Sequence, residues 1–441
     1  MRFTGYPLLL VAALDDSAKS SRWGDFHRHR YREVVTEPDA SVAISRAAHF
    51  PVGASITIER LTTDLHPTLT RLRANEPVSW LPALGGWLVT DHRTAIEILR
   101  DPDRFTVDDD RFTTGRVVGP SMLSTDGAQH RAHRGPFEPM FRRAPVGDFA
   151  DTIGTTATAL VDGFKPNHEA ELRTAFAAPL ATSVIASFLG FHDHCATAAD
   201  TARVDDRLLS AYRTIVDTVV GLGTGTADSD DAAGAMIHIE DVVERAVRSG
   251  GPLARLSDDH GGISREQLRS NVAVILFGAI ETCEGMTANA IGHILADGAV
   301  IGRLRAGTVD VHRVVNESLR LEPAAAVVDR YATTDIDLGP NGAASIAAGD
   351  LVEVSLAGAN RDPTVFPDPD RFDPDRAGVG QHLAFARGPH VCLGLHLAKL
   401  QTAVALETLV RELPTIEFDE ERSVAPRGHI FRKPERVSAT W

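Results

Sequence analysis

One short segment constrains this chain more than any other. Phe385-Ala-Arg-Gly388-Pro-His390-Val-Cys392-Leu-Gly394 puts a single cysteine in a glycine-containing loop, directly before a run typical of a helix. The glycines permit a tight turn and a close approach of a flat ligand to the backbone. A cysteine at a helix start meets the positive end of the helix dipole, which lowers its pKa and favours the thiolate that binds metals. A lone cysteine is more often a buried packing residue, but this pattern favours a ligand at Cys392.

The nearby histidines raise the alternative of a zinc site. His382, His390 and His396 lie close to Cys392 in the sequence. Structural zinc sites are tetrahedral and usually show CxxC or HxxxH spacing. The spacing here is irregular and only one cysteine is present, so zinc is disfavoured.

Composition limits the classes of function. The chain has 441 residues, of which 43% are hydrophobic and 24% charged, as in a soluble globular protein with a large core. Its net charge of −15 argues against nucleic acid as the main partner. The three cysteines (Cys195, Cys283 and Cys392) lie far apart, which excludes a disulfide framework and favours a reducing cytoplasm.

The first 60 residues look like an N-terminal extension of uncertain structure, and we expect residues 61–441 to form a single domain. The apolar run Pro7–Leu14 is too short for a transmembrane helix and is followed by two aspartates. We interpret it as a buried or interfacial segment and expect no membrane role. Export, or a start codon assigned too early, are the alternatives.

Helices dominate the rest of the chain. Ser264 and Gln267 have capping-box spacing before an apolar run of roughly 30 residues, which would span about 45 Å. Further helices are expected over Val309–Leu321 and from near Leu393 to about Glu412, and strand-like alternation over 351–356. The sequence therefore predicts a mainly α fold with small β-sheets (α+β). The glycine-rich break at 221–235 is either a lid or a plain surface loop.

The cysteine segment resembles the haem-binding signature of the cytochrome P450 family, Phe-x-x-Gly-x-x-x-Cys-x-Gly, with Ala398 following as expected. Two departures are Ala386, where bacterial members often have glycine, and Lys399, where arginine is common. The resemblance covers roughly residues 65–441. It implies the cytochrome P450 fold, with a long central helix over a haem and the cysteine loop before the last long helix. It also implies haem b (iron protoporphyrin IX) as cofactor, with Cys392 on the iron.

Further segments match this family in order along the chain. Glu317 and Arg320 resemble its E-x-x-R pair, which implies a buried structural pair rather than an exposed one on a helix surface. His130 and Arg134 share a helix face at i, i+4, and the resemblance gives both to the haem propionates. It assigns Arg330 and His390 the same role; solvated surface charges are the alternative.

The middle of the long helix carries the remaining match. Gly278-Ala-Ile-Glu281-Thr282 resembles the oxygen-activating stretch of the family. This implies that Thr282 holds water against O2, that a local helix distortion frees a carbonyl, and that Glu281 leads to a proton path. An ordinary helix hydroxyl is the alternative for Thr282. The expected substrate-pocket residues are Ala279, Ala325, Ala326 and Val327.

The resemblance implies a monooxygenase that inserts an oxygen atom from O2 into a small organic substrate, with electrons from a ferredoxin or flavodoxin. Hydroxylation, epoxidation or oxidative coupling in secondary metabolism all fit this reaction. A peroxide-driven peroxygenase or decarboxylase is disfavoured by the Glu281-Thr282 pair, and a non-catalytic haem protein is the alternative of another class. A basic patch for an acidic redox partner is predicted from Arg131, Arg142, Arg143, Arg376, Arg387 and Lys399; scattered solvated charges are the alternative.

Overall fold

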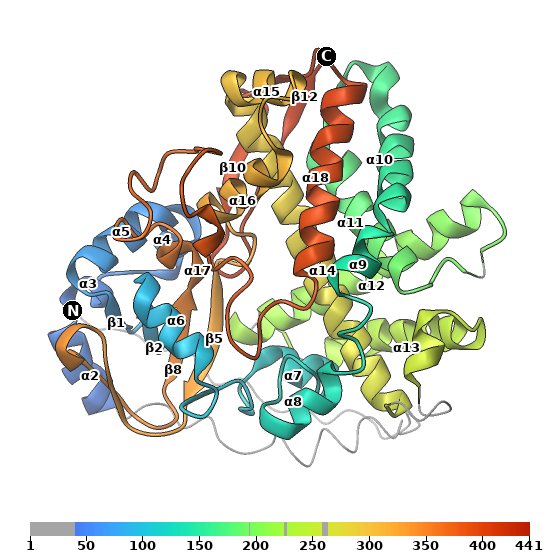
Figure 1. Ribbon diagram of the computed structural model, residues 1–441. Coiled ribbons are helices and arrows are strands. Elements are labelled where there is room, and N and C mark those ends of the chain that lie inside the picture. Colours follow the sequence, from blue (N-terminus) through green and yellow to red (C-terminus); the bar gives the residue numbers. More distant parts are fainter. Residues whose placement is uncertain (1–39, 194, 225–226, 258–262) are drawn as a thin grey trace, which may run out of the picture. The chain divides into compact units, whose positions relative to one another are not determined.

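The long helix α14 (Arg265–Ala296) runs through the middle of the structure, a computed structural model (Figure 1). It starts with the predicted capping box: Ser264 Oγ accepts from the Gln267 amide, and the Gln267 side chain accepts from the Ser264 amide. Its 32 residues span about 48 Å. Nearly all positions between Leu268 and Leu295 are buried. The predicted long central helix is therefore confirmed.

The structure describes residues 40–441, apart from 194, 225–226 and 258–262. One compact unit extends over Ser41–Trp441, so it begins before the predicted boundary at residue 61. Two contacts tie its first residues to the sheet region: Arg46 Nη2 lies 2.7 Å from an Asp350 carboxylate oxygen, and Phe50 packs edge-on against Trp87. The Pro7–Leu14 run lies outside the described residues.

Helices make up most of this unit, and α11, α12, α16 and α18 are among those packed around α14 (Figure 1). None of the described helices has the length and apolar character that a membrane span requires. The remaining helices are α2 (Ala40–His49), α3 (Pro51–Ala54), α4 (Ile58–Thr63), α5 (Leu65–Asn75), α6 (His92–Arg100), α7 (Thr113–Val118), α8 (Gly127–Arg134), α9 (Arg143–Gly147), α10 (Ala150–Phe164), α11 (Ala178–Phe188), α12 (Ala198–Thr224), α13 (Ala233–Arg248), α15 (Gly298–Arg305), α16 (Val311–Leu321), α17 (Leu356–Ala359) and α18 (Leu395–Glu412).

The strands form small sheets, the largest of which lies beside α3 and α6 on the left of Figure 1. Its order is β1 (Val78–Leu81), β2 (Gly86–Val89), β8 (Leu351–Ser355), β5 (Val327–Ala332) and β3 (Phe105–Thr106), and only β2 and β8 pair in parallel. The smaller sheets join β4 (Glu169–Glu171), β12 (Ser438–Thr440) and β9 (Glu417–Phe418); β6 (Ile336–Leu338) and β7 (Ala344–Ile346); and β10 (Val424–Arg427) and β11 (Lys433–Arg436).

The predicted break at 221–235 separates two helices that pack on each other. Its first residues complete α12, which ends at Thr224, and its last residues start α13 at Ala233. Between them, Asp228 and Asp231 form a reciprocal capping box. The break between the two helices is therefore shorter than the predicted 221–235, and both interpretations, a lid and a plain surface loop, stay predictions.

Candidate active site

The cysteine loop folds back on itself just before α18. The Cys392 amide donates to the Phe385 carbonyl at 2.9 Å, and the Val391 amide donates to the Gly388 carbonyl at 3.1 Å. Gly388 has a φ of +75°, and a Cβ there would lie 2.1 Å from the Leu99 carbonyl oxygen. Only glycine fits that position, because both the backbone conformation and the space exclude a side chain. The loop thus presents Cys392 at a defined place in front of the helix.

Ala386 explains one departure from the family signature. Its φ of 54° lies in the left-handed region where glycine is favoured. Its amide still donates to the Leu383 carbonyl at 2.8 Å, and its methyl group packs into the hydrophobic cluster of the sheet region. The turn usual for glycine is therefore kept by an alanine, at a strain of about 1 kcal/mol.

The thiol of Cys392 differs from the expectation in one respect. Burial raises its pKa, and this outweighs the lowering by the Gly394 amide and Arg134. The helix start alone therefore does not produce a thiolate. A coordinated metal ion deprotonates a thiol outright, so the sulfur is suited to a cationic ligand rather than to free nucleophilic chemistry.

A cluster of basic side chains lies beside this loop, and it contains all four predicted propionate ligands. His130 and Arg134 come from α8 and Arg330 from β5; the His130 ring lies 4.2 Å from the ring of His390, centroid to centroid. Electrostatic interactions link Arg134 and Arg330 to His390. Asp126, whose role the sequence did not reveal, bonds His390 Nε2 through its Oδ1 at 2.7 Å.

The donors of this cluster fit an anionic ligand. Both ring nitrogens of His130 are buried without a hydrogen-bond partner. Burial lowers the pKa of Arg330 to about 10, and its guanidinium bonds the carbonyl oxygen of Asp329. Buried donors need acceptors, and the two propionate carboxylates of a haem are suitable ones. Two of the three histidines weighed for zinc have hydrogen-bond partners: His390 bonds Asp126, and His382 bonds Asn316.

The middle of α14 opens onto a free space on one side. Gly278, Ala279 and Thr282 keep exposed surface, whereas the residues around them are buried. A Cβ at Gly278 would meet nothing within 4 Å. The neighbouring Cys283 thiol has its pKa raised to about 12 by burial and by the charge of Cys392, so this part of α14 lies near the cysteine loop. Cys392 would hold the iron of a cofactor bound at this place, and Thr282 lies on the exposed face of α14.

Thr282 itself is arranged differently from the prediction. Its hydroxyl donates to the Gly278 carbonyl. The helix is continuous from Arg265 to Ala296, and the predicted local distortion stays a prediction. A threonine hydroxyl can satisfy a carbonyl one turn back without breaking the helix. The Gly278 carbonyl is therefore occupied, not unpaired.

The predicted pocket residues divide into two groups. Ala279 and Ala325 keep exposed surface, but Ala326 and Val327 are buried in a cluster with Leu88 and other apolar residues. A run of small apolar residues does not tell which of them face the core. Here Ala326 precedes β5 and Val327 begins it, and both pack into the same buried cluster. Near Ala325, Phe431 forms a β-bridge and its ring lies 5.5 Å from that of Phe277 on α14, centroid to centroid. This aromatic pair was not predicted.

Glu317 and Arg320 form the predicted pair at the end of α16. Both side chains are completely buried, and two contacts of 2.8 Å join the guanidinium to the carboxylate. Arg320 also donates to the carbonyls of Asn360, Pro369 and Arg371. The pair therefore fixes the irregular segment 360–371.

The same framework reaches the cysteine loop. Asn360 Oδ1 accepts from the Leu383 amide at 2.6 Å, two residues before Phe385. Arg376 pairs with Glu317 at 3.0 Å and is buried, so it is not part of a surface patch as predicted. In the sequence, Arg376 follows Phe372-Asp373-Pro374-Asp375, and this context does not tell whether the arginine is buried or exposed.

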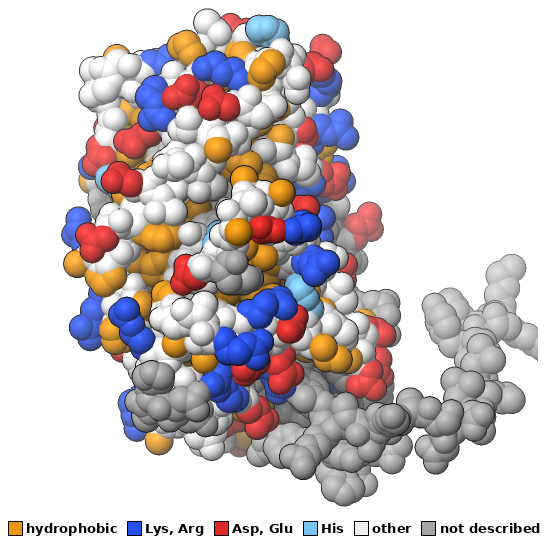
Figure 2. Space-filling model, turned by 90° about the vertical axis from the view of Figure 1, so that its right-hand side faces the viewer, with side chains coloured by type: hydrophobic (Ala, Val, Ile, Leu, Met, Phe, Trp, Pro, Cys, Tyr) orange, Lys and Arg blue, Asp and Glu red, His pale blue; other side chains and the backbone are white. Residues whose placement is uncertain are grey.

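Cations remain on the surface near the loop. Arg131, Arg142 and Arg143 are exposed, and Arg143 on α9, which packs on α18, interacts electrostatically with His396. On the face shown in Figure 2, Lys and Arg side chains are mixed with Asp and Glu. Any basic surface is therefore local within this acidic protein.

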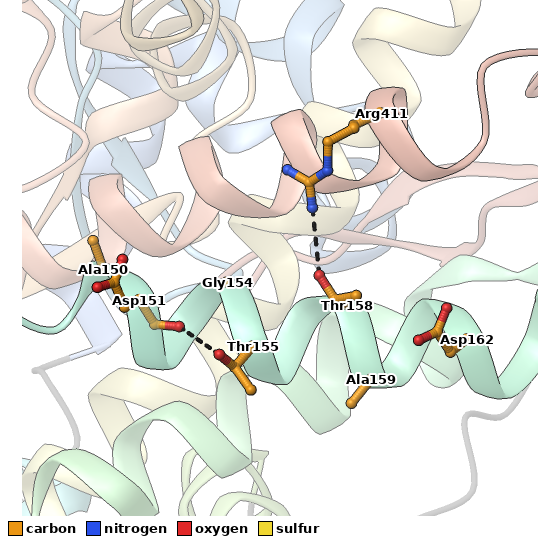
Figure 3. Close-up of a pocket in the computed structure, with 8 residues that line it drawn as sticks. All are labelled: Ala150, Asp151, Gly154, Thr155, Thr158, Ala159, Asp162 and Arg411. Carbon is orange, nitrogen blue, oxygen red and sulfur yellow. Dashed lines mark hydrogen bonds between the residues drawn. The ribbon is translucent and has the colours of Figure 1, made fainter.

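A surface groove of 630 Å³ lies elsewhere, between α10 and α18. Figure 3 shows Arg411 reaching across from α18 to the Thr158 hydroxyl, with Asp151 and Asp162 along α10. None of the predicted site residues lines it. The groove is a seam between two packed helices, and the chemistry lies at the cysteine loop.

Comparison with known proteins supports this assignment. The Cytochrome P450 family model matches residues 311–438. Cytochrome P450-SOY of Streptomyces griseus is 31% identical over 384 residues, which cover 82% of this chain and 87% of that protein. The chain belongs to the cytochrome P450 family.

Other relatives agree with this P450 assignment. The 20-oxo-5-O-mycaminosyltylactone 23-monooxygenase of Streptomyces fradiae is 28% identical over 368 residues, or 78% of this chain and 81% of that protein. The solved structure of CxnD, a P450 for C–S bond formation in chuangxinmycin biosynthesis, superposes with a TM-score of 0.75 at 26% identity, covering 87% of this chain and 96% of that one. The predicted fold and enzyme class are confirmed: this is a P450 monooxygenase, and its cofactor is haem.

Proposed function

We propose that this P450 inserts one atom of O2 into a small organic substrate, with electrons from a ferredoxin or flavodoxin. Substrate, O2, two electrons and two protons give the oxygenated product and one water. The observation that carries the proposal is the exposed face of α14 at Gly278 and Thr282, on a helix that lies near the loop presenting Cys392. We also propose a cytoplasmic location, supported by three unpaired cysteines.

The basic cluster and the loop are proposed to hold the haem. Cys392 would ligate the iron, and His130, Arg134, Arg330 and His390 would bind the propionates. When bound, haem supplies the redox-active iron at which O2 is reduced, and a thiolate ligand favours O–O cleavage. Asp126 orients His390 through their 2.7 Å hydrogen bond, so that its other ring nitrogen can face an anion.

The chain supplies protons and excludes water. Thr282 Oγ1 holds a proton on the exposed face of α14, in its hydrogen bond to the Gly278 carbonyl. We propose that this hydroxyl delivers protons at the site and that Glu281 replenishes them. We propose that the aromatic pair Phe277 and Phe431 keeps the substrate side of α14 apolar.

The substrate class is proposed from the relatives. Their names include a 20-oxo-5-O-mycaminosyltylactone 23-monooxygenase and an enzyme of chuangxinmycin biosynthesis, so we propose that this P450 tailors a secondary metabolite. Hydroxylation is the simplest reaction that the site supports. We propose that an acidic redox partner docks at the exposed Arg131, Arg142 and Arg143.

The proposal is tested by the carbon monoxide difference spectrum of the reduced protein. Wild type should show the thiolate-type band, and Cys392→Ala should lose it. Cys283→Ala is the matched control, because this second thiol lies close by and should not be a ligand. Loss of the band in Cys283→Ala only, or a wild type that takes up no haem, would overturn the proposal. Thr282→Ala should keep the band and release more peroxide per NADPH.

A further inference from the structure

Asn271 on α14 joins three parts of the chain through one side chain. Its Oδ1 accepts from the Met122 amide at 2.8 Å, and its Nδ2 donates to the Gln267 carbonyl at 2.7 Å. The same Nδ2 lies 2.8 Å from Nδ1 of His133 on α8. A backbone amide can only donate and a carbonyl can only accept, so these partners fix the orientation of the Asn271 side chain and make His133 Nδ1 an acceptor. Together these three contacts form the Asn271 clamp.

The groups of the clamp are buried. Asn271 has no exposed surface, and Met122 and His133 each keep only 6% of theirs. Burial lowers the pKa of His133, so its ring stays neutral and Nδ1 can accept. Buried donors and acceptors need partners. Removing the Asn271 amide would therefore take away the partner of the Met122 N–H and of His133 Nδ1.

The segment that contains Met122, residues 119–125, is stiffened by bonds of its own. The Ser121 amide donates to Ser124 Oγ at 3.1 Å. The Ser121 carbonyl accepts from the Ser124 amide at 3.2 Å and from Thr125 Oγ1 at 2.8 Å. Because these bonds tie the segment together, a contact that fixes the Met122 peptide also fixes the rest of the segment.

The 119–125 segment ends the exposed face of α14. At 100° per residue, positions 271, 278 and 282 lie within about 40° of one another around the helix. Gly278 and Thr282 keep exposed surface, whereas Asn271, roughly two turns earlier, has none, because its side chain is bonded to the Met122 peptide. The helices on either side of the segment, α7 and α8, also pack on α14 (Figure 1). The open side of α14 is therefore closed at this end.

The same segment lies beside the basic cluster. Burial lowers the pKa of His130, and the nearby Met122 carbonyl opposes this shift. His130 is proposed to bind a haem propionate, and it is on the same helix as His133. The Met122 peptide thus lies between the proposed haem site and Asn271, where a molecule bound over the haem can meet it.

We propose that Asn271 and His133 are positioning residues that hold residues 119–125 on α14 and thereby limit the size of the molecule that fits over the open face. This inference rests on the proposed function, for which it names a specificity determinant. A molecule that extends from the haem along α14 toward Asn271 meets the 119–125 segment within about two turns of helix. While the clamp is intact the segment excludes bulky molecules, and without the clamp the segment yields to them.

The test uses two haem ligands of different size. Imidazole and clotrimazole both bind haem iron through an imidazole nitrogen, and the shift of the Soret band gives each Kd. In Asn271→Leu, which has a similar volume and no amide, imidazole should bind as in wild type. Clotrimazole should bind about fivefold more tightly, the factor that corresponds to one buried hydrogen bond. His133→Phe should strengthen clotrimazole binding less, because Asn271 keeps its other two partners.

Thr182→Val is the matched control. The Thr182 hydroxyl donates to the Ala178 carbonyl at 3.0 Å, is buried nearly as deeply as Asn271, and belongs to α11, which also packs on α14. Its loss should leave the ratio of the two Kd values unchanged, whatever its effect on Tm.

Hydrogen exchange followed by mass spectrometry gives a second readout that needs no haem ligand. The peptide containing Met122 should exchange faster in Asn271→Leu than in wild type, because the Met122 N–H loses its acceptor. In Thr182→Val this peptide should exchange at the wild-type rate. If Asn271→Leu does not fold, His133→Phe is judged by the same two measurements.

The outcomes separate the two proposals. If wild type lacks the thiolate-type band, the proposed function fails, while hydrogen exchange still tests the clamp. If the band is present but clotrimazole binds the variants no more tightly than wild type, the size limit is wrong. Equal changes in the Kd of imidazole and of clotrimazole would show that Asn271 is only structural. Unchanged exchange of the Met122 peptide would show that Asn271 does not hold the segment.

Discussion

Replacing Glu317 with glutamine should destabilise this P450 severely, although the side chains have the same shape. The Glu317 carboxylate accepts two hydrogen bonds of 2.8 Å from Arg320, one of 3.0 Å from Arg376 and one of 2.9 Å from the Asp373 amide. An amide in its place keeps one acceptor oxygen and turns an NH2 group toward a guanidinium. Arg320 is then left fully buried without a counter-charge.

The magnitude follows from that burial. Breaking a buried ion pair by removing one partner costs roughly 3–5 kcal/mol. Whole domains are stable by only about 5–15 kcal/mol. At roughly 2 °C per kcal/mol for a large domain, we expect a Tm loss on the order of 5–10 °C.

The assay is thermal unfolding followed by circular dichroism, together with the ratio of haem to protein after purification. Glu97→Gln is the matched control, because Glu97 makes an exposed pair with Arg104 at 3.3 Å; it should change the unfolding free energy by less than about 1 kcal/mol. Haem content should fall in Glu317→Gln, since the framework from Glu317 through Asn360 supports the cysteine loop. A variant that melts within about 2 °C of wild type and loads haem fully would refute this reasoning.

Three further predictions concern the loop and its surroundings. Burial lowers the pKa of His382 to about 3, so below pH 6.5 the unfolded chain binds a proton that the folded chain does not, and folding stability falls as the pH drops toward 3. In denaturant titrations at pH 7 and pH 5, the loss of unfolding free energy between the two pH values should be about 2 kcal/mol smaller in His382→Gln than in wild type. The exposed His49→Gln should leave this loss unchanged. Gly388→Ala should purify with little haem, measured by the Soret to protein absorbance ratio, because its Cβ would meet the Leu99 carbonyl oxygen at 2.1 Å; normal loading would contradict the loop geometry. Arg142→Glu with Arg143→Glu should slow reduction by ferredoxin severalfold without changing the carbon monoxide spectrum, whereas Arg60→Glu on α4 should have no effect; equal rates would remove the proposed docking surface.

Much of the site was predictable because its signals are local in the sequence. The cysteine loop is contiguous, and its glycines, cysteine and following helix act within a few residues of one another. Glu317 and Arg320 are three residues apart on one helix, and the capping box of α14 has the same spacing. Helical periodicity and turn chemistry depend on neighbours along the chain, so these features can be predicted from the order of residues.

Other features depend on segments that are distant in the sequence, and only the tertiary structure decided them. Asp126 and His390 are 264 residues apart, and Tyr212 and Glu281 are 69 apart. Such contacts arise from the register and packing of whole elements, which no local pattern encodes.

The sequence by itself therefore determined the chemistry at the cysteine loop, because a flat cofactor and its ligand need that local arrangement of glycines and one thiol. The tertiary structure alone decided how buried each group is. Burial raises the pKa of the Cys392 thiol. Arg376, which the sequence placed on the surface, lies in the interior, paired with Glu317. Desolvation depends on everything packed around a group, so it becomes defined only when the chain has folded.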